Sequence, residues 1–408
     1  MLHGIIKEKN KMFNYLSSTI KLRLLMNFIS KATSSMLLPF VTILYAKEFG
    51  IVIAGTLISI TSFFQIGFSI YGGQLTEKFG RIPLMKWGEC IKLFCFLVLL
   101  FYSNTWIVFF VITIISAAQG FINPAIDSML IDESNDEIKA KVLSLNNWIY
   151  NTSYLIGAMI GGWLFQKNFV VIVILLILSS LFVLWNIFAN MNETHIVLQS
   201  KKLKYGFFSS YSEVITNKKF VLFSIGMMFF LFLQRTLTNY IAVNFKSTLI
   251  PFTQIMLNQE QLLSVVLTIN TILVIAFLPI VTFKFNILKT RFFLILSMIL
   301  IPIGFFVLSY SNTFSHIIIG TILFTAGELV FTPSMQAVFI STIDEDNKGP
   351  YNAILSTFQS ISKILSSIFL SVSVIFTQFG NASLLFIVGF LGILLILLVS
   401  DKPNKLIT

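Results

Sequence analysis

Long apolar runs fill most of the chain and decide its fold class. A helix needs about 20 apolar residues to cross the hydrocarbon core of a membrane. Twelve runs of this kind cover residues 22–46, 51–73, 84–103, 105–130, 143–165, 169–190, 219–244, 260–283, 291–310, 314–340, 351–377 and 382–400. Only 11% of the residues are charged, against about 25% in a soluble protein. The sequence therefore predicts an all-α membrane protein with twelve transmembrane helices.

A weak internal repeat divides these runs into two sets of six. Asn123-Pro124 and Thr332-Pro333 each lie near the end of an apolar run, and a short acidic loop follows each. We expect two pseudo-symmetric six-helix bundles, at residues 1–190 and 219–408, joined by a cytoplasmic linker at 191–218. Membrane proteins built from such repeats usually carry a substrate site where the repeats meet. The repeat thus favours a transporter.

The positive charges are strongly biased to one set of loops. Of the 28 Lys and Arg residues, 21 lie in the two tails, the loops after even-numbered runs and the adjoining run ends, and three lie in the other loops. Basic loops remain on the cytoplasmic side of a membrane, so both termini are predicted to be cytoplasmic in a multi-pass protein of a bacterial cell membrane. The net charge of +11 is thereby explained by topology and contact with anionic lipid, and we expect no nucleic-acid partner.

The loop between the second and third runs carries the most specific motif. Its side chains Glu77, Lys78 and Arg81 cannot lie in lipid and require polar partners at the membrane face. The loop resembles the signature loop of the major facilitator superfamily, with matches at Gly73, Glu77, Lys78, Gly80 and Arg81 and with Ile82 in place of a final basic residue. The resemblance implies that Asp127 in the fourth run pairs with Arg81 and holds the outward-open state. A static salt bridge at the helix ends is the alternative.

Three glycines in the fifth run, Gly157, Gly161 and Gly162, give weaker support for export. They resemble the glycine-rich motif of drug–proton antiporters within this superfamily, although the proline expected between them is absent. Small residues that let two helices pack closely explain the same pattern.

The tenth run contains a single carboxylate, Glu328. An ionised carboxylate is costly inside a membrane, so this side chain is a candidate to bind a proton. The segment from Gly327 through Thr332-Pro333-Ser334 to the acidic loop resembles the LmrP-like multidrug transporters. That resemblance implies that Glu328 contacts drugs and exchanges a proton.

The other charges within the runs distinguish this chain from those transporters. Relatives of the LmrP type carry further acids, including one in the seventh run, where this chain has Gln234 and Arg235. Either Arg235 or Lys363 neutralises Glu328, or these cations and Lys31 attract an anionic or zwitterionic substrate. Glu89 lies three residues before Lys92, a spacing that suits a local ion pair in a helix, and is therefore interpreted as structural more than functional.

These features favour a secondary transporter over an enzyme. The chain has no nucleotide-binding loop, and its three histidines are far apart in the sequence, so we expect no cofactor and no metal site. We predict proton-coupled efflux of small amphiphilic compounds by a monomer, with substrate and membrane lipid as its only partners. A dedicated exporter of one siderophore, sugar or peptide, a lipid flippase, a proton-coupled importer and a non-transporting membrane partner are the alternatives.

Overall fold

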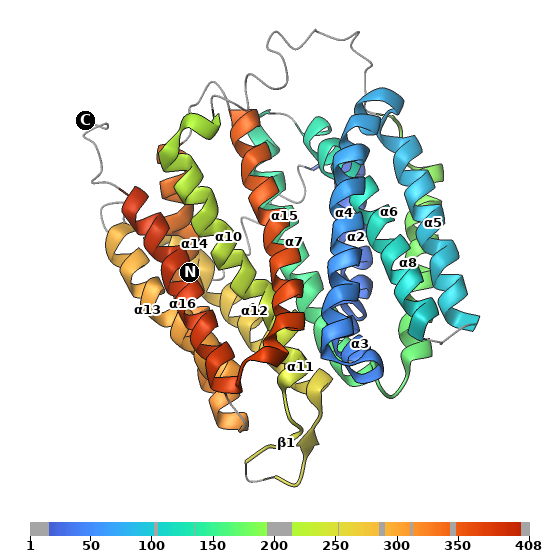
Figure 1. Cartoon of the computed structure of the whole chain (residues 1–408). Coiled ribbons are helices and arrows are strands. Elements are labelled where there is room, and N and C mark those ends of the chain that lie inside the picture. The colour runs from blue at the N-terminus through green and yellow to red at the C-terminus, as the bar shows by residue number, and fades with distance from the viewer. Residues whose placement is uncertain are drawn as a thin grey trace. The chain divides into compact units, whose positions relative to one another are not determined.

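The described part of the chain is almost entirely helical (Figure 1). A computed structural model describes residues 16–101, 105–134, 136–193, 214–251, 253–284, 290–310, 313–342 and 348–400. The helices form two compact units: Met1–Leu38 with Thr61–Gln199, and Pro39–Ile60 with Ser200–Thr408. The predicted domain ranges 1–190, 191–218 and 219–408 remain a prediction.

The first unit is a bundle of six helices. They are α2 (Ser18–Ser35), the greater part of α4 (Ile51–Phe79), α5 (Arg81–Phe101), α6 (Thr105–Asp132), α7 (Asp136–Leu164) and α8 (Phe169–Ala189). Helix α5 packs on α6 and α8, and α2 packs on α7 and α8.

The second unit contains the rest of the helices and a small hairpin. Its elements are η1 (Leu38–Phe40), α3 (Val41–Phe49), the first turns of α4, α10 (Lys218–Thr236), the π-helical turn η2 (Leu237–Ile241), α11 (Ala242–Asn244), β1 (Thr248–Leu249), β2 (Met256–Leu257), α12 (Gln259–Lys284), α13 (Thr290–Tyr310), α14 (Phe314–Thr342), α15 (Lys348–Val372), η5 (Ser373–Ile375) and α16 (Gln378–Val399). The strands pair antiparallel, with Thr248 opposite Leu257.

Residues Pro39–Ile60 join the second unit through close helix contact. Ser371 Oγ donates a hydrogen bond to the Val52 carbonyl oxygen at 2.8 Å. A Cβ added at Gly55 would lie 2.6 Å from the Ser367 carbonyl oxygen, so only glycine permits this approach of α4 to α15. Small residues allow helices in membranes to pack at such short range.

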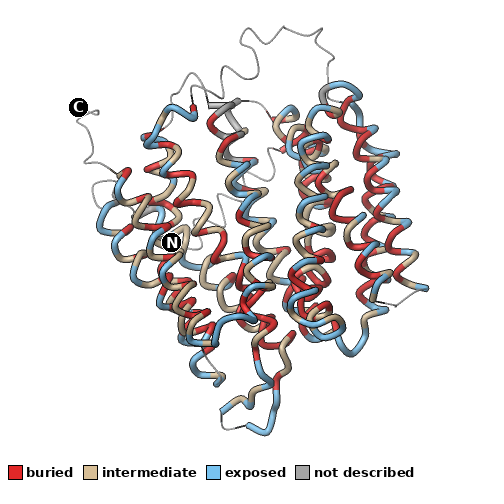
Figure 2. The backbone as a smooth tube through the Cα atoms, viewed as in Figure 1, coloured by how far each residue is buried: buried red, intermediate tan, exposed pale blue. Residues whose placement is uncertain are grey.

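Side-chain caps and apolar faces explain why these segments form membrane helices. Asn217 caps α10 by accepting a hydrogen bond from the Phe220 N–H at 3.2 Å, which satisfies one of the free donors of a helix start. Exposed residues line the outer helix faces in Figure 2. On α5 these include Trp87, Phe94 and Phe101, each more than 65% exposed. Large apolar side chains on an outer face suit contact with lipid.

Each of the twelve apolar runs forms helix in the structure. Within the described residues, ten helical segments are both long enough and apolar enough to cross a membrane. Two further helices, α5 and α7, have 21 and 29 residues but are more polar. Helix α5 carries Arg81, Lys86, Glu89 and Lys92, and the first half of α7 is polar. The hairpin β1–β2 was not expected from the sequence.

Candidate functional site

The backbone of the signature loop is held by the carboxylate of Glu193, a residue from the last part of the first unit's sequence. Gly80 separates α4 from α5 with a φ of +88°. Glu193 accepts hydrogen bonds from the backbone N–H groups of Arg81 at 3.0 Å and Ile82 at 2.9 Å. A negative charge at a helix start also interacts favourably with the helix dipole. The glycine of the motif is therefore required by both its backbone conformation and the position of Glu193.

Arg81 forms an ion pair with Asp132, whereas the resemblance implied a pair with Asp127. Its Nε lies 2.7 Å from Asp132 Oδ2, so the predicted pair with Asp127 is corrected. Arg81 begins α5 and Asp132 ends α6, which brings these two residues to the same end of the adjacent helices. Asp127 lies five residues deeper in α6, about 7.5 Å along the axis, and interacts electrostatically with Arg23 instead.

Gly73 and Lys78 of the loop motif lie on α4. A Cβ added at Gly73 would meet no atom within 4 Å. Lys78 is exposed, and its Nζ lies 5.2 Å from the centre of the Phe79 ring. The side chain of Glu77 lies outside the described residues.

The glycines of the fifth run lie on α7. A Cβ added at Gly157 would lie 2.7 Å from Ser35 Cβ and would also collide with the backbone of Ala32. Gly161 and Gly162 are buried. Gly157 thus has a direct packing role, because it lets α7 approach α2.

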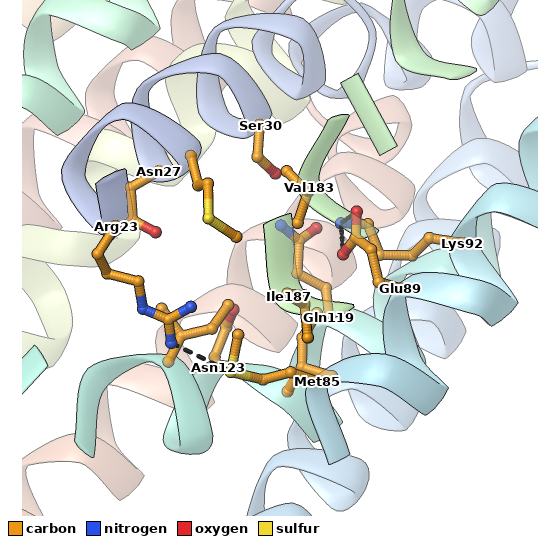
Figure 3. A pocket seen from close by; sticks show the side chains of 13 residues that line it. Arg23, Asn27, Ser30, Met85, Glu89, Lys92, Gln119, Asn123, Val183 and Ile187 are labelled. Atoms are coloured by element: carbon orange, nitrogen blue, oxygen red, sulfur yellow. Dashed lines mark hydrogen bonds and ion pairs between the residues drawn. The ribbon is translucent and has the colours of Figure 1, made fainter. Parts of the chain in front are cut away.

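A polar cavity lies inside the first unit (Figure 3). Four helices line it with Arg23, Met26, Asn27 and Ser30 from α2, Met85, Glu89 and Lys92 from α5, Gln119, Ile122, Asn123 and Ile126 from α6, and Val183 and Ile187 from α8. Polar groups in a membrane bundle usually face one another or water. The cavity therefore provides an interior, away from lipid, for side chains that lipid would exclude.

Glu89 and Lys92 form a buried ion pair in this cavity. Lys92 Nζ lies 3.1 and 2.8 Å from the two carboxylate oxygens of Glu89, and Ser180 Oγ donates to Glu89 Oε1 at 3.0 Å. Both charged side chains are less than 5% exposed. The pair is neutral overall and uses the three-residue spacing identified in the sequence.

Arg23 is a buried cation that sequence reasoning did not identify. It is 1% exposed, and its Nη1 and Nη2 donate to Met191 Sδ at 3.4 Å and Met85 Sδ at 3.1 Å. Its Nε has no hydrogen-bond partner among the described residues. Because Arg23 lies near the start of the first run, its position in the sequence assigns it to the cytoplasmic basic residues.

Lys31 lies beside two tyrosines of α7. Its Nζ is 2.5 Å from Tyr150 Oη, 4.0 Å from the centre of the Tyr150 ring and 5.7 Å from that of Tyr154. One helical turn earlier, Asn27 Nδ2 donates to Asn146 Oδ1 at 3.0 Å. Helices α2 and α7 thus share two successive polar contacts.

Glu328 lies in the second unit between two amide side chains. Gln234 Nε2 donates to its Oε1 at 2.8 Å, and Asn270 Nδ2 donates to its Oε2 at 3.0 Å. Asn270 also donates to Thr325 Oγ1 at 3.1 Å. No cation pairs with Glu328 among the described residues. Helices α10, α12 and α14 each contribute one member of this Glu328 cluster, which comprises Gln234, Asn270 and Glu328.

The two cations considered as partners of Glu328 have other surroundings. Arg235 follows Gln234 on α10 and is exposed. Lys363 is half-buried on α15, and its carbonyl oxygen accepts hydrogen bonds from the hydroxyls of Ser366 and Ser367. Among the described residues, no group of three His, Cys, Asp or Glu side chains is arranged to hold a metal ion.

Asn270 and Glu193 were both missed in the sequence. Asn270 is the single asparagine in the apolar run of α12. Polar side chains are rare in membrane-spanning helices and are usually functional, so Asn270 could have been identified from the sequence. Glu193 lies just beyond α8 in a polar stretch, where nothing local indicates its partner.

The sequence comparisons identify a membrane transport family. A model described as Major Facilitator Superfamily matches residues 23–251. The chain is 26% identical over 152 residues to the Na(+), Li(+), K(+)/H(+) antiporter of Planococcus maritimus, a match that covers 36% of each protein. It is 24% identical over 153 residues to the multidrug resistance protein MdtH of Salmonella paratyphi B, which covers 36% of this chain and 38% of MdtH. These matches thus span little more than a third of each relative.

Solved structures share the fold over nearly the whole chain. A POT family transporter in complex with 5-aminolevulinic acid has a TM-score of 0.75 at 14% identity, over 95% of this chain and 97% of that one. The human organic anion transporter MFSD10 (TETRAN) has a TM-score of 0.64 at 13% identity, over 92% and 98%. At these identities the structures show the fold alone. The predicted all-α fold is confirmed, and the chain belongs to the Major Facilitator Superfamily, whose members are transporters and not enzymes.

Proposed function

We propose that this protein is a proton-coupled secondary transporter that exports small amphiphilic compounds by alternating access. The observation that carries the proposal is Glu328, an acid in a membrane-spanning helix with two amide partners and no cationic partner among the described residues. Ionisable side chains within membranes are costly and usually functional. A proton is the simplest positive charge that relieves this cost.

The two amides suit both protonation states of Glu328. In the structure, Gln234 and Asn270 donate N–H groups to the two oxygens, as an ionised carboxylate requires. A side-chain amide carries an oxygen acceptor beside its N–H₂ donor, so rotation of either amide provides an acceptor for the protonated acid. The cluster therefore keeps its hydrogen bonds in both states, and protonation changes the charge and the amide orientation.

This change in charge provides the coupling between proton and substrate. A ligand shifts a conformational equilibrium only by its difference in affinity for the two states. If the proton and the substrate favour opposite states of Glu328, binding of one promotes release of the other. States separated by a few kcal/mol are sufficient for this exchange.

The relatives and the sequence motifs support export as the direction. One relative is named a multidrug resistance protein and another an antiporter, and the glycines of α7 resemble those of drug–proton antiporters. The distribution of Lys and Arg supports cytoplasmic termini in a bacterial cell membrane. We further propose that the transporter acts as a monomer without a cofactor.

A dedicated exporter of one metabolite and a lipid flippase of the same fold are the main alternatives. A dedicated exporter predicts no resistance to a panel of toxic dyes and the accumulation of one metabolite in cells that lack the protein. A flippase predicts lipid translocation in reconstituted vesicles without any added small molecule.

The test is efflux of ethidium and Hoechst dye from energised cells that express the wild type, Glu328→Gln or Glu48→Gln. Glu48 is an exposed acid on α3, so its variant controls for loss of a carboxylate outside the Glu328 cluster. We expect protonophore-sensitive efflux in the wild type and Glu48→Gln and its loss in Glu328→Gln at equal expression. Undiminished protonophore-sensitive efflux in Glu328→Gln would refute the role of Glu328.

A further inference from the structure

We infer that Lys31, Tyr150 and Tyr154 form a subsite for the head group of transported amphiphiles that carry an oxyanion. This inference rests on the proposed transport function and adds to its substrates, beside the dyes that test it, compounds that carry a carboxylate or a similar singly charged oxyanion. The three residues are called the Lys31 subsite below.

The first argument is the charge of Lys31. It lies in a membrane-spanning segment, Ser18–Phe49, where an uncompensated ammonium is costly. Its described contacts are a hydroxyl and two aromatic rings. These contacts stabilise a cation without neutralising it.

The second argument is that the described acids of the first unit interact with other groups. Glu89 pairs with Lys92, Asp132 pairs with Arg81, Glu193 caps α5, and Asp127 and Glu133 interact electrostatically with Arg23. No carboxylate among the described residues forms an ion pair with Lys31. A ligand oxyanion would supply the missing negative charge.

The third argument is the direction of the hydrogen bonds. An ammonium group has only donors, so in the contact at 2.5 Å the Tyr150 oxygen accepts and its O–H proton points away from Lys31. Lys31 Nζ retains two further N–H donors. The subsite therefore presents several donors, which is the complement of an oxyanion.

The fourth argument is the position of the subsite on the bundle. Tyr150 is 51% exposed, and Lys31 is half-buried. Asn27 and Asn146 continue the same polar face one turn earlier. Charged side chains within a membrane face the bundle interior or a water-filled cavity and not lipid. With Tyr150 exposed, the Lys31 subsite is accessible to a solute, and the tyrosine rings can contact the apolar part of that solute.

The experiment measures binding of three ligands that share a naphthalene ring and differ in charge. The probes are 1-naphthoate, 1-naphthamide and 1-naphthylmethylammonium, tested by equilibrium dialysis against the purified full-length protein without any gradient. For the wild type we expect naphthoate to bind about tenfold more tightly than naphthamide, as one charge-assisted contact predicts, and the ammonium probe to bind most weakly.

Variants assign the preference to named side chains. Lys31→Met is expected to lose the tenfold preference for naphthoate, Lys31→Arg to keep it, and Tyr150→Phe to reduce it severalfold. Lys167→Met, at an exposed lysine after α7, serves as the control for loss of a positive charge. A single symmetrical peak in size-exclusion chromatography identifies variants that remain folded, and Lys31→Arg provides the test if Lys31→Met does not fold.

The outcomes separate the subsite from the transport mechanism. Equal or absent binding of the three probes, tightest binding of the ammonium probe, or an unchanged preference in folded Lys31→Met would overturn the inference. Competition by phosphatidylglycerol would still support an oxyanion site and would assign its occupant to lipid. If naphthoate binds through Lys31 but Glu328→Gln retains proton-driven efflux, the subsite stands and the coupling proposal fails.

Discussion

Lys47 and Glu260 form an ion pair in the second unit although 213 residues separate them in the sequence. Lys47 Nζ at the end of α3 lies 2.7 Å from Glu260 Oε1 in the first turn of α12. The side chain of Glu260 is 2% exposed and that of Lys47 is 41% exposed. Glu260 Oε2 has no hydrogen-bond partner among the described residues, so Lys47 is the principal compensation for this buried charge.

Loss of Lys47 should therefore destabilise the protein. Lys47→Met leaves the Glu260 carboxylate buried without its cation, and we expect a cost of about 2 kcal/mol. The midpoint of thermal unfolding in detergent should fall, and the double variant Lys47→Met/Glu260→Gln should recover most of the loss. Lys167→Met is the control. An unchanged midpoint in Lys47→Met would show that the pair contributes nothing to stability.

Gly80 should be far less tolerant of a methyl group than Gly73. Gly80→Ala places a Cβ in a left-handed backbone conformation and 2.7 Å from Glu193 Oε2, with an expected cost of about 1–2 kcal/mol from the backbone alone. Gly73→Ala meets no neighbouring atom, and alanine stabilises a helix by about 1 kcal/mol relative to glycine. Thermal midpoints of the two variants compare these effects. Equal midpoints would contradict the role given to Glu193.

The Glu89–Lys92 pair predicts a strong asymmetry between single and double variants. Lys92→Met leaves Glu89 ionised in the cavity with Ser180 as its one remaining described partner, and breaking a buried pair costs about 3–5 kcal/mol. Glu89→Gln/Lys92→Met removes both charges and should be much less harmful. The yield of monodisperse protein in size-exclusion chromatography measures the difference. Equal yields for the two variants would indicate that the charges do not depend on each other.

Glu133 should make stability depend on pH. Burial raises the pKa of its carboxyl group, Arg23 opposes that increase, and Asp132 adds to it. The folded state therefore binds this proton more tightly than the unfolded state, so the contribution is complete below the ordinary pKa of glutamate, about 4.3, and is lost as the pH rises through the raised pKa. We expect a smaller decline of the thermal midpoint between pH 5 and pH 8 in Glu133→Gln. Parallel curves for wild type and variant would exclude this contribution.

The helices, Glu328 and the Glu89–Lys92 pair could be predicted from the sequence because their signals are local. A run of about 20 apolar residues has a single stable solution in a membrane, since backbone groups must be paired within the segment. Glu328 was identified for a similar reason, because a lone carboxylate in an apolar run is conspicuous. Each prediction required only one segment of sequence.

The partners of charged residues that lie on different helices could not be predicted, because they depend on helix packing. Asp127 and Asp132 both lie on α6, and only the alignment of α5 with α6 decides that Arg81 pairs with Asp132. Lys47 and Glu260 come from distant segments with no shared motif. Arg23 is counted as a loop cation by its position in the sequence, yet it is buried and lines a cavity between four helices.

The most direct test of the central claim is proton-driven transport by purified protein in proteoliposomes. A pH gradient is imposed, and ethidium and 1-naphthoate are assayed separately. The measured quantities are the accumulation of each probe against its concentration gradient and the internal pH. The account predicts that the wild type and Glu48→Gln accumulate at least one probe at the expense of the gradient. It predicts that Glu328→Gln equilibrates the same probe across the membrane without accumulating it. Accumulation by Glu328→Gln at the wild-type level, or wild-type transport that ignores the pH gradient, would contradict the account.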